Sequence, residues 1–176
     1  ALNRSVSGVR GGGRVVWAGD GWRVAGANGV GRLAATMSGR GMGLSFNNTA
    51  TSLTVDTSGG VTGIATNAVT VSLSTTTSGD ITLNQNVNVG TSATTLTSAG
   101  KISQTGGSIT AKSLGVTAVN AVLRTGNNAF GTLAASVSTA GDAFALPHHA
   151  PQLTLQTAHG QTGSTPQTWS PQGTTA

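Results

Sequence analysis

Short alternations of hydrophobic and polar residues, each closed by a small turn, recur along most of the chain. Stretches such as Leu53-Thr54-Val55 and Val71-Ser72-Leu73 place an apolar side chain at every second position. This alternation is typical of a β-strand with one buried face. Helical periodicity and helix capping signals are absent from the sequence, so the pattern predicts an all-β protein.

The turns between these alternations recur at a nearly constant interval. The clearest turn positions are 20 or 21 residues apart, and they are Gly59, Gly79, Gly100, Asn120 and Gly141. Glycine and asparagine are the residues that best tolerate a positive φ. Residues 26–38 and 126–138 also share seven of thirteen identities at an offset of 100, which is five units of 20. Carrying the turn position back by 100 residues places it at Asp20 and Gly41.

A repeat of this length predicts a stack of coils. At about 3.3 Å per residue, twenty extended residues trace a loop of roughly 65 Å, which suits one coil of a single-stranded parallel β-helix, or β-solenoid. An antiparallel sandwich would need turns every 8–12 residues and does not explain one position recurring at each step. We therefore predict a β-solenoid of seven or eight coils of about 20 residues. Its inward column is predicted to hold Val61, Ile81, Ile102 and Val122.

The same register makes a sharper prediction about two charged residues. Asp80 and Lys101 each follow the turn glycine of their coil, so they are expected to lie side by side on adjacent coils.

The solenoid is predicted to cover residues 1–156, with the clearest repeats in residues 20–146. Residues 157–176 contain Pro166 and Pro171 and few apolar side chains. Proline lacks the N–H that a strand ladder needs. We expect this segment to be an irregular or disordered tail.

Charge is scarce and unevenly placed. Charged residues make up 7% of the chain, which has no cysteine and a net charge of +5. Residues 1–40 hold six arginines against the single acidic residue Asp20, and these are Arg4, Arg10, Arg14, Arg23, Arg32 and Arg40. A basic segment attracts polyanions. One alternative function is therefore binding of a polyanionic glycan or nucleic acid through residues 4–40, with nucleic acid the less favoured ligand.

Candidate catalytic and metal chemistry is sparse. His148 and His149 are neighbours and would point to opposite faces of a strand, and His159 lies further along the chain. The four aspartates are widely separated in sequence, whereas glycan hydrolysis needs convergent carboxylates. We expect no enzyme activity, no metal site and no cofactor, and a β-helix glycan-degrading enzyme is kept as a second alternative. The twenty-residue spacing of Thr57, Thr77, Thr97 and Thr117 raises ice binding as a weaker possibility.

The segments GDITLNQNVNVGTSATTLTSAGKISQTGGSITAKSLGVTAVNAVL and GNNAFGTLAASV resemble the β-strand repeats of filamentous haemagglutinin-type bacterial proteins. Such proteins are exported by two-partner or autotransporter routes. The resemblance implies a structural and adhesive rod at the cell surface or outside the cell, with host-cell or bacterial glycans or proteins as partners. It also implies possible end-to-end association or continuation in a longer chain. No stretch reaches the roughly 18 apolar residues of a membrane span, and we expect any export signal to lie outside this chain.

Overall fold

The computed structural model shows an all-β protein whose strands stack into a parallel β-solenoid. It has about five turns with a spacing of about 22 residues. The structure describes residues 4–5, 10–11, 14–18, 22–49, 52–123, 127–138, 153–156 and 168–169. No helix occurs among these residues. The predicted fold class is thus confirmed, with fewer and longer turns than the seven or eight coils expected.

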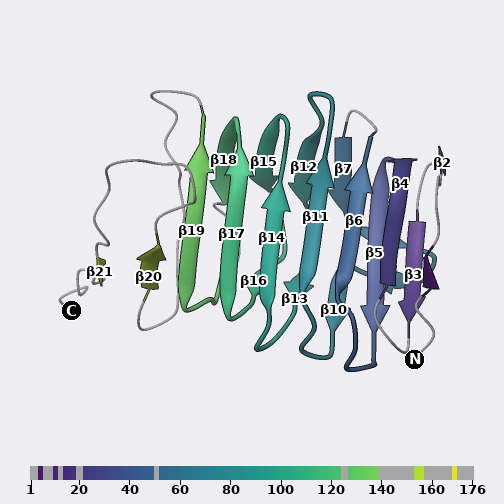
Figure 1. The fold of residues 1–176 in the computed structure, drawn as a ribbon, viewed down its shortest axis with the longest axis horizontal. Helices are drawn as coiled ribbons and strands as arrows, with labels where there is room; N and C mark the ends of the chain where they lie inside the picture. The colour runs from purple at the N-terminus through teal and green to yellow at the C-terminus, as the bar shows by residue number, and fades with distance from the viewer. Residues whose placement is uncertain are drawn as a thin grey trace.

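The first side of the stack, which we call face A, is a sheet of upright parallel strands (Figure 1). In spatial order these strands are β1 (Arg4–Ser5), β4 (Trp22–Val30), β6 (Leu44–Asn48), β11 (Val71–Thr75), β14 (Ala93–Thr97), β17 (Ser113–Ala118), β19 (Thr132–Val137) and β20 (Leu153–Gln156). A short strand β2 (Arg10–Gly11) also pairs with β4. At the far end β21 (Thr168–Trp169) pairs with β20 in the antiparallel direction.

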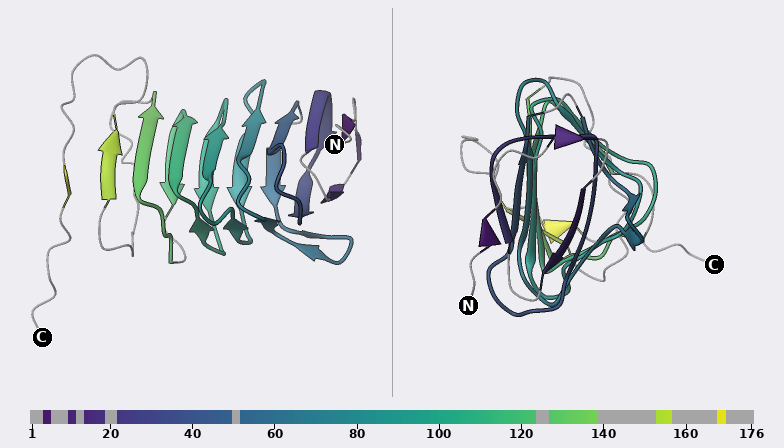
Figure 2. Two further views of the ribbon diagram at one scale, coloured as in Figure 1. Left: turned by 60° about the horizontal axis from the view of Figure 1, so that its bottom comes forward. Right: turned by 90° about the vertical axis from the view of Figure 1, so that its right-hand side faces the viewer.

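The other two sides of the stack belong to one further sheet. Face B contains β7 (Ser52–Val55), β12 (Asp80–Leu83), β15 (Lys101–Gln104) and β18 (Asn120–Leu123). Face C contains β10 (Ile64–Thr66), β13 (Val87–Asn88) and β16 (Ile109–Thr110). The single strand β5 (Arg32–Met37) pairs with β7 and with β10, so it joins the two faces, and β3 (Arg14–Ala18) pairs with β5. Viewed along the stack, the turns superimpose into a three-sided outline (Figure 2, right).

The pairing links each turn only to the turns beside it. Across the described strands, parallel partners are between 18 and 29 residues apart in sequence. Alternation along each strand then decides what is buried, as in β6, whose Leu44 and Phe46 are buried while Ser45 and Asn47 are exposed. Aliphatic residues from the three faces meet in one continuous core along the axis.

The inward column of face B confirms part of the predicted register. Ile81 pairs with Ile102, and both are fully buried. The next partner is Ala121 and not Val122, which is only half-buried. At the other end Leu53 pairs with Ile81. Val61 is buried, but it lies outside this column.

The difference at Val61 comes from a hairpin inserted between faces B and C. Strands β8 (Thr57–Ser58) and β9 (Val61–Thr62) pair antiparallel with each other. Gly59 and Gly60 form the turn between them, with φ of 55° and 81°. The hairpin extends toward the N-terminal end and contacts β5 (Figure 2, left). The prediction that Gly59 occupies the coil corner is therefore wrong, because its strands pair with each other and not with the neighbouring turns.

The corner between faces A and B holds two of the other predicted turn glycines. Gly79 and Gly100 are adjacent there, and the Gly100 N–H donates to the Gly79 carbonyl at 3.2 Å. Asn120 does not join them, because it pairs with Lys101 as the first residue of β18. The corner before β18 consists of Val119 alone, whereas the earlier corners have three or four residues. Gly41 lies at a different corner, between faces C and A, and Asp20 and Gly141 lie outside the described residues.

The sequence match at an offset of 100 does not correspond to equivalent places in the stack. Residues 32–37 form β5, which belongs to faces B and C, whereas residues 132–137 form β19 of face A. The two segments also differ in burial, since four residues of β5 are buried while in β19 only Leu133 is. Sequence similarity alone therefore did not identify the face.

Buried polar side chains stabilise the corner between faces A and B. Asn48, Thr75 and Ser98 occupy consecutive positions of one column. The hydroxyls of Thr75 and Ser98 both donate to the Gly79 carbonyl, and Asn48 donates to the Ser52 carbonyl at 3.0 Å. Buried polar groups are tolerated when they are paired in this way. The column therefore fixes the path of the chain as it leaves face A.

One buried hydroxyl lacks such a partner and provides a stability test. Thr94 is 1% exposed, lies in register between Val71 and Leu114, and its Oγ1 makes no hydrogen bond within the described part of the chain. Thr94→Val keeps the shape and removes the unpaired group, so we expect a gain of about 1 kcal/mol in the free energy of unfolding. Chemical denaturation followed by circular dichroism would measure it.

Thr95→Val is the matched control for this variant, since Thr95 is the next residue and is exposed. Its free energy of unfolding is expected to change by less than about 0.5 kcal/mol. A loss of stability in Thr94→Val would show that its hydroxyl is paired in solution.

Candidate functional site

The six arginines of the basic segment are spread over several strands and corners. The strands of Arg4 and Arg23 belong to face A, while Arg14 and Arg32 lie on strands β3 and β5 of the other sheet. Arg10 lies on β2, and Arg40 lies on the corner between β5 and β6. The six arginines thus come from strands of both sheets and from one corner, and the polyanion site stays a prediction.

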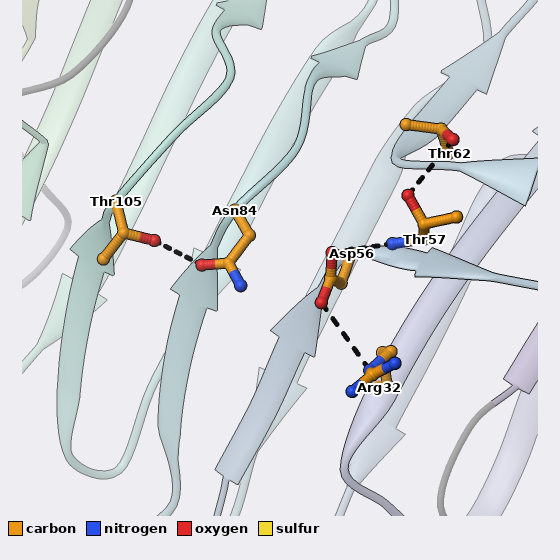
Figure 3. Close-up of polar contacts among 6 residues, drawn as sticks. All are labelled: Arg32, Asp56, Thr57, Thr62, Asn84 and Thr105. Carbon is orange, nitrogen blue, oxygen red and sulfur yellow. Dashed lines mark hydrogen bonds and ion pairs between the residues drawn. The ribbon is translucent and has the colours of Figure 1, made fainter.

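Arg32 has an acidic partner. Its Nε lies 3.6 Å from Asp56 Oδ2, and the side chains are 54% and 25% exposed (Figure 3). The other Asp56 oxygen accepts a hydrogen bond from the Thr57 N–H at 2.8 Å. Across the hairpin, the hydroxyls of Thr57 and Thr62 are hydrogen-bonded to each other at 3.1 Å. Asp56 thus connects the base of the hairpin to β5, which gives the ion pair a structural role. Because the pair is solvated, its contribution to the free energy of folding is under about 1 kcal/mol.

Asp80 and Lys101 lie side by side on adjacent turns, as the sequence predicted. The residues that follow them, Ile81 and Ile102, are register partners. The contact made is between the Asp80 carboxylate and the Lys101 backbone N–H at 2.7 Å, not between the two charged groups. A Cβ at Gly100 would lie 2.3 Å from Asp80 Oδ1, so glycine is needed there to leave room for the carboxylate.

The remaining corner contacts are also structural. Thr105 donates to Asn84 Oδ1 on the preceding turn (Figure 3), and Ser108 N–H donates to Asn86 Oδ1 at 2.8 Å. Within the described ranges, no three metal-binding side chains come together. His148, His149 and His159 lie outside those ranges, so the prediction about them stays untested. The described part of the chain also has no helix long and apolar enough to cross a membrane.

The most regular surface is the outside of face A. Its exposed or half-exposed positions form two columns of small uncharged residues that run along the stack. One column contains Ser45, Ser72, Thr95, Gly115 and Ala134, and the other contains Asn47, Ser74, Thr97, Thr117 and Ser136. These side chains come from five successive strands, so face A repeats similar chemistry at each turn of the solenoid.

Only half of the predicted threonine series contributes to this surface. Thr97 and Thr117 are register partners on β14 and β17. Thr57 lies in the hairpin, and Thr77 lies at the corner between faces A and B with a φ of 61°. The four threonines therefore do not form one array, which removes the spacing argument for ice binding.

A shallow groove interrupts the regular surface where the chain enters face A. It has a volume of about 280 Å³ and is lined by Met42, Gly43, Leu44, Ser45, Thr70 and Ser72. Met42 is 53% exposed, which is unusual among the large apolar side chains of the described residues. The sequence carries no signal of this groove, since its lining residues come from two segments 27 positions apart in register and form no motif.

Comparison of the chain with protein-family models, with curated proteins and with solved structures finds no match.

Proposed function

We propose that the chain is a non-catalytic structural and adhesive module of a bacterial cell-surface or secreted protein. In this proposal the solenoid works outside the cell as a rod that makes weak contacts at many points, with surface glycans or proteins as partners. The observation that carries the proposal is the outside of face A, where five successive strands present the same two columns of small uncharged residues. The resemblance to haemagglutinin-type repeats adds support for the location and the partners.

A repetitive face suits multivalent binding better than tight binding at one point. Each turn offers a few polar groups that water already solvates, so a single contact contributes little free energy. Many such contacts on linked rods add up through effective concentration, which raises apparent affinity by about 10²–10⁴ without a new contact. The regular spacing of the columns is useful only when several positions are engaged together.

The proposal predicts that binding depends steeply on the density of the chain. Beads coated densely with the protein should bind cells or glycan-coated surfaces, while sparsely coated beads and soluble monomer should bind weakly, because only dense coats allow many simultaneous contacts. Flow cytometry of bead–cell mixtures would measure this. Beads carrying the Ile102→Asp variant, in which the core is disrupted, are the control for folded structure.

Two other outcomes would point to the alternative functions. Binding that is tight for soluble monomer and falls steeply with salt would favour a polyanion site over the proposed display role. Release of reducing sugar from a polysaccharide would contradict the non-catalytic proposal. Dense beads that bind no surface at all would also contradict it.

A further inference from the structure

The groove on face A results from corners of unequal length on neighbouring turns. The chain takes six residues, 38–43, to pass from β5 to β6, but only four, 67–70, to pass from β10 to β11. The longer corner carries the exposed Met42 to the rim of the groove. Gly43 lets the two corners approach closely at the floor of the groove, because a Cβ there would lie 2.2 Å from Thr70 Oγ1 and 2.3 Å from the Thr70 carbonyl oxygen.

The polar groups of the groove are available to a ligand. The hydroxyls of Ser45, Thr70 and Ser72 make no hydrogen bond within the described residues, and all three residues are exposed. On the same strands the hydroxyl of Ser74 is already engaged, since it donates to Asn47 Oδ1 at 3.1 Å. The groove therefore gathers three free donor–acceptor groups beside one apolar side chain.

Among the residues whose side chains the structure describes, none that lines the groove is charged. Arg40 is exposed on the same corner, but it is not among the lining residues. The volume of about 280 Å³ is just below the range of roughly 300–1,000 Å³ usual for drug-sized ligands. These features together describe a ligand that is small, uncharged, rich in hydroxyl groups and partly apolar.

We propose that this groove binds one uncharged sugar ring of a surface glycan. The hydroxyls of the ring pair with those of Ser45, Thr70 and Ser72, and its C–H surface lies against Met42, whose flexible thioether adapts to irregular partners. This inference rests on the proposed adhesive function and gives it a site and a ligand class. With so few contacts, the dissociation constant of one groove is expected to be on the order of a millimolar.

The two methionines of the chain provide a direct measurement. Met42 lies at the groove, whereas Met37 is 2% exposed in the core. Protein labelled with ¹³C at the methionine methyl groups should give two signals in an NMR spectrum. We expect titration with neutral methyl glycosides of glucose, galactose, mannose and N-acetylglucosamine to shift the Met42 signal saturably for at least one sugar. The Met37 signal should not move, so it is an internal control.

Two matched variants test whether the hydroxyls of the groove take part. Ser72→Ala removes one of them at an exposed position, and we expect it to weaken sugar binding by about three- to tenfold. Thr95→Ala removes a hydroxyl from the next position of the same column, outside the groove, and should leave binding unchanged. Both variants should retain the methionine spectrum of the folded protein.

The outcomes separate this inference from the proposed function. A Met42 signal that no neutral sugar shifts at concentrations well above a millimolar would overturn the inference, as would equal shifts of both methionines. Binding of glucuronate alone, abolished in Arg40→Gln, would also overturn it in favour of an acidic ligand. Dense beads that bind glycans equally well with Ser72→Ala would reject the groove while leaving the adhesive rod supported. Beads that bind nothing would reject the proposed function itself.

Discussion

Replacing Ile102 with aspartate is expected to cost more than about 4 kcal/mol of folding free energy and to prevent stable folding. Ile102 is fully buried and lies in register between Ile81 and Ala121, so neither partner can neutralise a charge. Circular dichroism during urea denaturation would measure the effect. Even if the new carboxyl stays protonated, the variant loses a large aliphatic group from the core.

The control for this variant is Thr95→Asp, which places the same charge on the exposed outside of face A. Its stability should stay within about 0.5 kcal/mol of the parent protein. Similar denaturation midpoints for the two variants would mean that Ile102 does not face the core.

Replacing Gly107 with alanine is expected to lower the free energy of unfolding by about 3 kcal/mol or more. Gly107 has a φ of +63°, which costs an alanine about 1–2 kcal/mol. Its new Cβ would also lie 2.3 Å from the carbonyl carbon of Gln85 on the preceding turn, where only backbone can move to relieve the collision. Overpacking of this kind adds typically 1–3 kcal/mol. Thermal unfolding would detect the loss as a large fall in Tm.

Gly90→Ala separates the two contributions. Gly90 has a similar φ of +57°, but a Cβ there meets nothing within 4 Å. The expected loss of stability in Gly90→Ala comes only from the strain of an alanine at positive φ, and is about 1–2 kcal/mol. Equal losses in the two variants would show that adjacent turns do not approach closely at Gly107.

The sequence predicted the stack well where successive turns have nearly equal lengths. The pairs Asp80–Lys101 and Ile81–Ile102 follow from counting residues, because the 21-residue separation within each pair is close to the 20-residue repeat seen in the sequence. Period-2 alternation also matches the burial of β7 and β11, where Leu53, Val55, Val71 and Leu73 are buried. These features depend on the alternation of apolar and polar residues and on the spacing between turns, and both can be read from a single sequence.

Features that depend on which strands pair were not predictable from the same pattern. Gly59 and Gly79 have similar neighbours in sequence, yet one closes a hairpin and the other a coil corner. The difference lies in the partner of the following strand, and a local alternation does not specify that partner. Asn120 was misplaced by one position because its corner is a single residue long.

The groove is unpredictable from sequence for a related reason. It exists because residues 38–43 and 67–70 bridge the same gap with different numbers of residues. Met42 and Ser72 become neighbours only through the pairing of β6 with β11. Their residue types alone carry no signal of a site, since neither belongs to a motif with known chemistry.

The nearest-neighbour pairing of the stack has a consequence for how the chain reaches its folded state. Because no parallel pair in the described strands spans more than 29 residues, each new turn needs only the turn already formed as its template. The entropy lost in closing such short loops is nearly the same at every step and does not grow with the length of the rod. The polypeptide can therefore fold turn by turn, and lengthening the rod would add folding steps without making any one of them slower.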